Sequence, residues 1–191
     1  MANKSLSSVV ILISGSGSNL QSIINNADNI GIKIDCVISN KADAFGLERA
    51  KNADIATKII DHTQFSTRED FDQSLKQHIN TFNPKLIILA GFMRILSVEF
   101  IDAFAGKILN IHPALLPKFK GLNTHQRAID AGEAFAGASV HFVTNELDSG
   151  EVILQKSVAI EANDDALKLA KKVLEQEHIL YPKAIQKVLQ R

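Results

Sequence analysis

The chain has 191 residues, enough for one domain that buries about 70% of the surface exposed by its unfolded chain. Lysine plus arginine and aspartate plus glutamate number 21 each, so the formal net charge is zero and gives no electrostatic footprint for nucleic acid or an anionic membrane. The single cysteine, Cys36, excludes an internal disulfide framework. The longest apolar run, residues 9–13, is too short to span a bilayer, and no secretory pattern precedes it. We therefore expect a cytoplasmic protein without nucleic-acid or membrane partners.

Short β-branched runs alternate with longer helical patterns along the chain. The predicted strands are residues 8–13, 32–38, 55–60, 85–90 and 107–112, and the predicted helices are residues 18–28, 45–52, 66–82, 97–105, 124–131 and 165–190. After residue 136 two further strands, 139–144 and 151–160, are joined by a turn over 145–150. This pattern predicts an α/β fold with a doubly wound, mostly parallel, Rossmann-like sheet and an antiparallel edge addition, in a single domain over residues 1–191.

Two local signals concern the helix boundaries. Residues 66–69, Ser-Thr-Arg-Glu, have the pattern of a capping box that opens the third predicted helix. Pro182 lies inside the last predicted helix, where its ring removes a backbone donor and clashes with the preceding turn. We expect a kink or an interruption at that residue.

Residues 14–19, Ser-Gly-Ser-Gly-Ser-Asn, follow the first predicted strand and open a helix. Glycines permit close approach of the backbone to a ligand, and the N–H groups at a helix start favour an anion such as phosphate. The loop does not match a dinucleotide fingerprint, because Leu20 occupies the third small position and no acid ends the second strand. A phosphomonoester is the better functional interpretation. The alternative is a glycine turn that only connects strand to helix.

Two more segments follow predicted strands. Residues 90–96 (AGFMRIL) come after the fourth strand, although a core-packed turn with Ser97 as a helix cap explains them equally well from spacing alone. Asn110 and His112 end the fifth strand on one face, and Pro113 stops the strand there. The carboxyl ends of parallel strands are where doubly wound proteins bind ligands. The convergence of the three segments predicts a functional site.

Other chemistry-bearing residues give weaker signals. The remaining histidines show no metal-ligand spacing with Cys, Asp or Glu, and we interpret most of them as surface or satisfied core residues; they are His62, His78, His125, His141 and His178. Lys118 and Lys120 lie in a loop that is either a solvated basic loop or a mobile flap near an anionic ligand. Asp148 is an ordinary turn residue unless the fold brings it close to His112.

Six segments together resemble the phosphoribosylglycinamide formyltransferases, folate-dependent enzymes of purine biosynthesis. They are GSGSNL, NKADAFGLERA, LAGFMRIL, LNIHPALLPKFKGLNTH, SVHFVTNELDSG and EQEHILYP, and the likeness extends from Val9 to Pro182. The Asn-x-His-Pro-x-Leu-Leu-Pro pattern is shared by the wider folate-dependent formyltransferase superfamily. GSGSNL and QEH point to this member of it.

The resemblance implies a role for each matching position. The matching catalytic residues are Asn110, His112 and Asp148. The matching ribotide positions are Gly17, Ser18 and Asn19 for the phosphate and Glu177 for the sugar. The matching folate-binding positions are Arg68, Met93, Arg94, Ile95, Leu96, Asn110, Thr144, Asn145, Glu146, Leu147 and Asp148.

The implied reaction moves a formyl group from 10-formyltetrahydrofolate, the co-substrate, to the amine of glycinamide ribonucleotide by direct attack, with no metal. N–H donors on Asn110 and His112 suit the oxyanion that develops on the formyl oxygen, and a carboxylate at Asp148 favours a charged imidazolium at His112. The expected partners are these small molecules alone, and the chain is expected to be a monomer or a weak homodimer.

Three positions depart from the family pattern. Leu174 stands where relatives can carry a polar residue toward the ribotide, and Lys120 and Asn123 replace other residues of the flap. Three other functions stay open as alternatives: methionyl-tRNA formyltransferase, formyltetrahydrofolate hydrolase and a non-catalytic ribotide-binding module. The zero net charge disfavours the first, the GSGSNL loop disfavours the second, and the intact trio disfavours the third.

Overall fold

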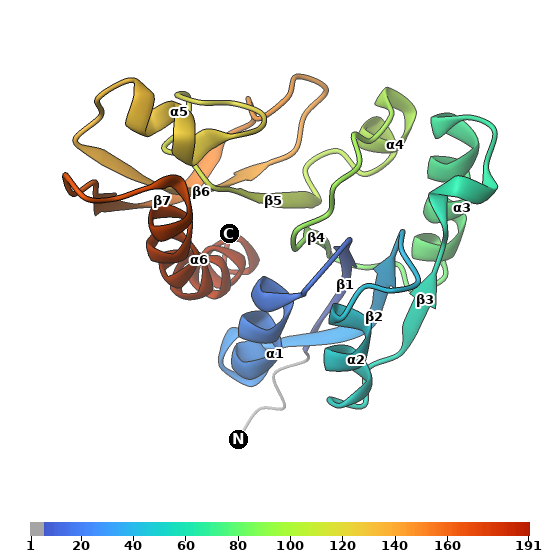
Figure 1. Cartoon of the computed structure of the whole chain (residues 1–191). Coiled ribbons are helices and arrows are strands. Elements are labelled where there is room, and N and C mark those ends of the chain that lie inside the picture. The colour runs from blue at the N-terminus through green and yellow to red at the C-terminus, as the bar shows by residue number, and fades with distance from the viewer. Residues whose placement is uncertain (1–5) are drawn as a thin grey trace.

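The computed structural model describes residues 6–191, so the first five residues of the predicted domain lie outside it. The described chain forms a seven-stranded sheet in the order β3-β2-β1-β4-β5-β6-β7, in which β1 to β5 are parallel and β6 and β7 are antiparallel (Figure 1). The strands are β1 (Ser7–Ile13), β2 (Ile32–Ser39), β3 (Thr57–Ile59), β4 (Leu86–Leu89), β5 (Ile108–His112), β6 (Phe135–Phe142) and β7 (Val152–Ala159). The predicted mostly parallel sheet with an antiparallel edge is confirmed.

Helices cover both faces of the sheet, as the alternating pattern predicts. They are α1 (Ser18–Ile30), α2 (Gly46–Lys51), α3 (Arg68–Asn80), α4 (Val98–Ala103), α5 (Thr124–Asp130) and α6 (Ala166–Leu189), with a short 3-10 turn at His62–Gln64. Side chains of α1, α2, α5 and α6 pack on one face, and those of α3 and α4 pack on the other. Strand β1 shows why: Val9 and Ile11 belong to the first core while Val10 and Leu12 belong to the second. A strand buried on both faces needs the continuous apolar run that the sequence has.

The strand order reverses between β1 and β4, which makes this edge the switch point where ligands bind in open α/β sheets. The loops that leave the two strands touch there. Ser14 donates its backbone N–H to Gly91 O at 3.1 Å, and its hydroxyl accepts from Met93 N at 2.8 Å. The phosphate-loop candidate and the 90–96 segment are therefore one connected surface.

Helix α6 runs unbroken through Pro182, so the predicted interruption is wrong. Proline cannot donate to the carbonyl four residues earlier, which belongs to His178. The hydroxyl of Ser22 on α1 donates to that carbonyl instead. A tertiary hydrogen bond thus replaces the one that proline removes, and Pro182 itself is buried.

Several boundaries differ from the predicted ones, and two of these differences have a clear structural origin. The N-cap of α3 is Thr67, which stands in extended geometry and whose hydroxyl accepts from Asp70 N at 3.1 Å, so the cap begins one residue later than the predicted box. Strand β6 begins at Phe135 and not at residue 139, because its ladder with β7 continues to the Phe135↔Ala159 pair. Weak strand formers before residue 139 conceal this extension.

Candidate active site

Asn110 and His112 share one face of β5, as their i, i+2 spacing predicts. The antiparallel register places Asn110 opposite His141 and His112 opposite Ser139 of β6. Directly opposite residues of an antiparallel pair project to the same side, so all four side chains belong to one patch. His112 and His141 are buried.

Asp148 comes to this patch from the turn between β6 and β7. Its Oδ2 lies 3.3 Å from His112 Nδ1 and accepts from Gly121 N at 2.9 Å. The backbone of Asp148 has φ 48°, a left-handed conformation that Asp and Asn tolerate better than most residues. The proximity to His112 that would make Asp148 more than a turn residue is therefore present.

Asp148 is an ionised carboxylate in a buried place. Burial opposes ionisation, but hydrogen bonds from His141 and Gly121 and the positive charge of His112 outweigh it, so the pKa of Asp148 lies below its usual value. A carboxylate held charged beside an imidazole stabilises the imidazolium. The charged carboxylate of Asp148 thus faces Nδ1 of the His112 ring.

His141 belongs to this patch, although its sequence pattern is that of a surface or satisfied core histidine. Its Nδ1 lies 2.8 Å from Phe142 O, an acceptor only, so Nδ1 carries a hydrogen. Its Nε2 lies 3.3 Å from Asn110 Nδ2 and 3.6 Å from Asp148 Oδ1. The His141 ring nitrogen thus lies between the Asn110 amide and the Asp148 carboxylate and links the two residues. The β5–β6 register brings His141 opposite Asn110, and no local sequence pattern indicates this contact.

The loop after Pro113 covers the outer nitrogen of His112. Phe119 O lies 2.9 Å from His112 Nε2, and Lys120 Nζ bonds to Glu146 Oε1 at 3.2 Å and to the Ser149 hydroxyl. The family departure at Lys120 therefore ties this loop to the turn that carries Asp148. His125 of α5 lies nearby: burial and then the charge of His112 lower its pKa.

The phosphate-loop candidate opens α1 without any side-chain cap. Gly17 occupies the N-cap position with φ 71°, and a Cβ there would meet Gly46 Cα at 2.6 Å. Gly17 is thus required by its own backbone and by its packing on α2, and not only by close approach of a ligand. The N–H groups of the first turn, which includes Ser18 and Asn19, have no acceptor within the helix, and such groups at a helix start favour anions. Arg49 adds a positive charge, with its Nε donating to Ser16 O at 2.8 Å.

Asn19 and Glu177 meet at the base of this loop. Asn19 Nδ2 donates to Glu177 Oε2 at 2.7 Å, and both residues are buried. Asn19 Oδ1 is buried without a hydrogen-bond partner among residues 6–191. Burial raises the pKa of Glu177, and the bond from Asn19 offsets only part of that rise. Leu174 lies half-buried about one helical turn before Glu177.

Glu177→Gln is expected to stabilise the fold at neutral pH while weakening ribotide binding. Because the folded-state pKa of Glu177 is raised, its contribution to stability is greatest below its ordinary pKa and is lost as pH rises through the folded value. Thermal melts should therefore show a higher Tm for the variant at pH 8, and the difference should vanish toward pH 4. The KM for the ribotide should rise about 10–100-fold, the value of a charged hydrogen bond. Equal melting curves at pH 8 would contradict the buried charge.

The folate-binding candidates lie in three segments around the patch. Ser97 N donates to Asp72 Oδ2 at 2.5 Å, which holds the start of α3, and hence Arg68, beside the 91–96 segment. Arg94 packs over the Phe71 ring at 6.0 Å.

The turn over residues 144–148 is also tied to the fold, since Asn145 Nδ2 donates to Asp102 Oδ1 of α4 at 3.0 Å. The exposed apolar side chains of the candidate set are Met93, Ile95 and Leu147, whereas Leu96 is buried. Thr144 and Glu146 belong to the same turn as Asp148, where the Thr144 hydroxyl donates to Glu146 O at 3.1 Å.

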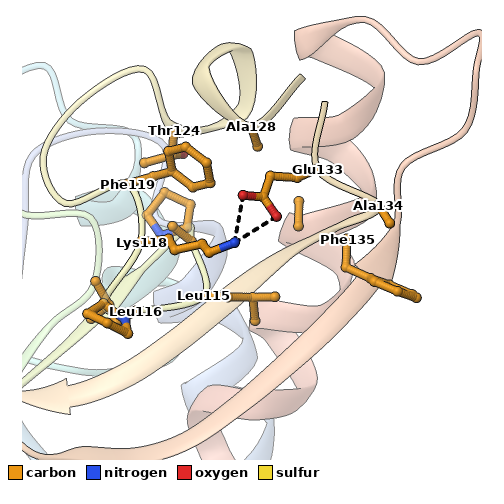
Figure 2. A pocket seen from close by; sticks show the side chains of 13 residues that line it. Leu115, Leu116, Lys118, Phe119, Thr124, Ala128, Glu133, Ala134 and Phe135 are labelled. Atoms are coloured by element: carbon orange, nitrogen blue, oxygen red, sulfur yellow. Dashed lines mark hydrogen bonds and ion pairs between the residues drawn. The ribbon is translucent and has the colours of Figure 1, made fainter. Parts of the chain in front are cut away.

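A separate cavity of about 390 Å³ lies behind the Pro113–Phe119 loop, between that loop, α5 and the start of β6. Figure 2 shows Lys118 reaching across it to Glu133, with Nζ 2.7 and 3.0 Å from the two carboxylate oxygens. Its wall is mostly apolar and contains none of the predicted site residues.

No group of three or more His, Cys, Asp or Glu side chains within residues 6–191 is arranged to hold a metal ion. Within the same range, no helix is both long and apolar enough to cross a membrane.

Three comparisons with known proteins identify the same family. The sequence model of the Formyl transferase family matches residues 7–185. A phosphoribosylglycinamide formyltransferase of Escherichia coli is 50% identical over 179 residues, which cover 93% of this chain and 84% of that protein. The human trifunctional purine biosynthetic protein adenosine-3 is 43% identical over 94% of this chain and 18% of its own length.

A solved phosphoribosylglycinamide formyltransferase from Coxiella burnetii superposes with a TM-score of 0.90 at 48% identity, covering 95% of this chain and 86% of that one. The similarity of sequence and of fold thus extends over nearly the whole described chain, including the strands that carry Asn110, His112 and His141. The chain belongs to the formyl transferase family.

Proposed function

We propose that this chain transfers the formyl group of 10-formyltetrahydrofolate to the amine of glycinamide ribonucleotide in purine biosynthesis. The observation that carries the proposal is the Asp148–His112 pair, 3.3 Å apart, beside the Asn110 amide at the carboxyl edge of the sheet. Relatives that are similar over nearly the whole chain bear the name of this activity. We propose further that it acts on small molecules in the cytoplasm, as a monomer or weak homodimer.

The residues fit direct attack on a formyl carbon. As the amine adds, negative charge develops on the formyl oxygen, where Asn110 Nδ2 and an N–H of His112 can donate. Each such donor is worth about 10²–10³ in rate. The amine loses a proton and the folate nitrogen gains one as it leaves, and a positioned acid–base group in that role contributes about 10²–10⁴. These steps need hydrogen-bond donors and a proton carrier but no metal.

The ribotide phosphate is proposed to lie at the start of α1, on the N–H groups of Ser18 and Asn19. The orphaned Asn19 Oδ1 then accepts from a sugar hydroxyl, and Glu177 accepts from another. Arg49 supplies a positive charge beside the same loop. This arrangement leaves the substrate amine directed toward the patch on β5.

The folate is proposed to bind across the opposite side of the patch. The backbone of residues 93–96 faces its ring, the turn over residues 144–148 closes over it, and Arg68 meets its carboxylate tail. His112 Nε2 must leave Phe119 O before it can reach the formyl oxygen, so the loop after Pro113 shifts when the folate binds.

The test is to follow loss of the formyl group from 10-formyltetrahydrofolate with and without glycinamide ribonucleotide. Transfer is expected to depend on the ribotide, with little deformylation in its absence. A rate that is equal without ribotide would instead indicate hydrolysis, and formylation of initiator tRNA under the same conditions would indicate the tRNA-directed alternative. Either outcome would overturn the proposal.

A further inference from the structure

Tyr181, the only tyrosine of the chain, is buried beneath the candidate active site. It projects from α6, and its hydroxyl lies 3.0 Å from Leu89 O and 3.0 Å from Leu109 O. These carbonyls belong to neighbouring strands, β4 and β5. A phenol that bridges two strands of a sheet is an unusual polar group in a core of aliphatic side chains, and the steps proposed above do not use it.

The bridge lies where the two strands separate. The pairing of β4 with β5 ends at Leu89↔Asn110, whereas Ile111 and His112 continue along β6. Leu89 is the last residue of β4, and Leu109 directly precedes Asn110. The Tyr181 hydroxyl therefore closes the end of the β4–β5 ladder, at the point from which the Asn110 side chain projects.

The phenol is held in its donor form. Burial raises the pKa of Tyr181 well above its usual value, and the charge of Glu177 raises it further, so the hydroxyl keeps its proton at neutral pH. Glu177 stands four residues earlier on α6, which places both side chains on one face of the helix. Helix α6 thus contacts β4 and β5 through Tyr181 and the phosphate-loop residue Asn19 through Glu177.

We propose that Tyr181 is a positioning residue: by bridging Leu89 O and Leu109 O it sets the place of the Asn110 amide relative to the folate segment after β4. This role rests on the proposed function. Catalysis demands close placement of the oxyanion donors, and a shift of about 1 Å can cost 10²-fold in rate. The hydroxyl is outside the reach of substrate, so it acts only through the two strands.

The test uses the full chain with Tyr181→Phe, which keeps the ring and removes the bridge. At a temperature where thermal melts show both proteins to be folded, kcat is expected to fall about 10-fold with both KM values unchanged, because the lost placement belongs to the transition state. The matched control is Ile185→Val, a fully buried truncation one turn further along α6 that touches no strand carbonyl through a polar atom. It should melt earlier but keep the wild-type kcat.

A second arm asks whether the effect passes through Asn110. In an Asn110→Ala background, Tyr181→Phe should lower kcat by less than about 2-fold, because coupled residues are not additive. In the ligand-free protein, the side-chain amide resonance of Asn110 should shift in Tyr181→Phe and stay in place in Ile185→Val. An unshifted resonance, full activity of Tyr181→Phe, or independent losses in the double variant would overturn the role. A wild type without ribotide-dependent transfer would overturn the proposed function, whatever the resonance shows.

Discussion

Asp148→Asn is expected to lower kcat for formyl transfer by at least about 10²-fold while both KM values change little. The substitution removes the charge that stabilises an imidazolium at His112, whose Nδ1 lies 3.3 Å from Asp148 Oδ2. It keeps the shape of the turn, because asparagine tolerates the φ of 48° found at this residue. The lost interaction belongs to proton transfer and to oxyanion stabilisation, which both develop in the transition state.

The measurement compares kcat at neutral pH for the wild type, Asp148→Asn, His112→Ala and the double variant. Members of one catalytic unit are not additive, so the double variant should lose much less than the product of the two single losses. Thermal melts establish that all four proteins are folded. Near-full activity of Asp148→Asn, or losses that multiply, would show that Asp148 does not act through His112.

Asn110→Ala is expected to lower kcat by about 10²–10³-fold, the value of one oxyanion donor. The Asn110 amide lies in the patch with Nδ2 3.3 Å from His141 Nε2, and its NH2 group carries two hydrogens, one of which can donate to the formyl oxygen. Because Asn110 is already half-buried and its strand is paired on both sides, truncation should change the fold little. The readout is kcat and both KM values under saturating ribotide and folate.

Asn80→Ala is the matched control for this variant, since Asn80 is exposed at the end of α3. It loses an amide of the same size and should keep the wild-type kcat. A rise in the folate KM without a loss of kcat in Asn110→Ala would mean that Asn110 only binds the co-substrate. That outcome would leave the oxyanion without the donor proposed here.

Much of the fold could be predicted because its signals are local. Apolar β-branched runs such as residues 9–13 and 86–89 and helical repeats between them identify parallel strands, and the order of elements along the chain then implies the doubly wound sheet. Pro182 shows the limit of local rules. The chain around it predicts a break, yet the Ser22 hydroxyl, far away in sequence, satisfies the carbonyl that proline leaves free.

The residues of the candidate site also differ in whether local sequence patterns predict them. Asn110 and His112 are readable from the sequence alone, because the two-residue period of a strand and the following proline place both side chains on one face at a strand end. The glycine loop before α1 is also readable from the sequence, because its glycines stand between a predicted strand and a predicted helix.

Asp148 and His141 are different, because no local pattern relates them to His112 or Asn110. Asp148 resembles any turn residue until the hairpin of β6 and β7 returns it to β5, and His141 resembles a core residue until the antiparallel register sets it opposite Asn110. Periodicity determines which face of its own element a side chain occupies. Which faces meet depends on strand pairing between segments about 30 residues apart, and only packing of the whole sheet decides that.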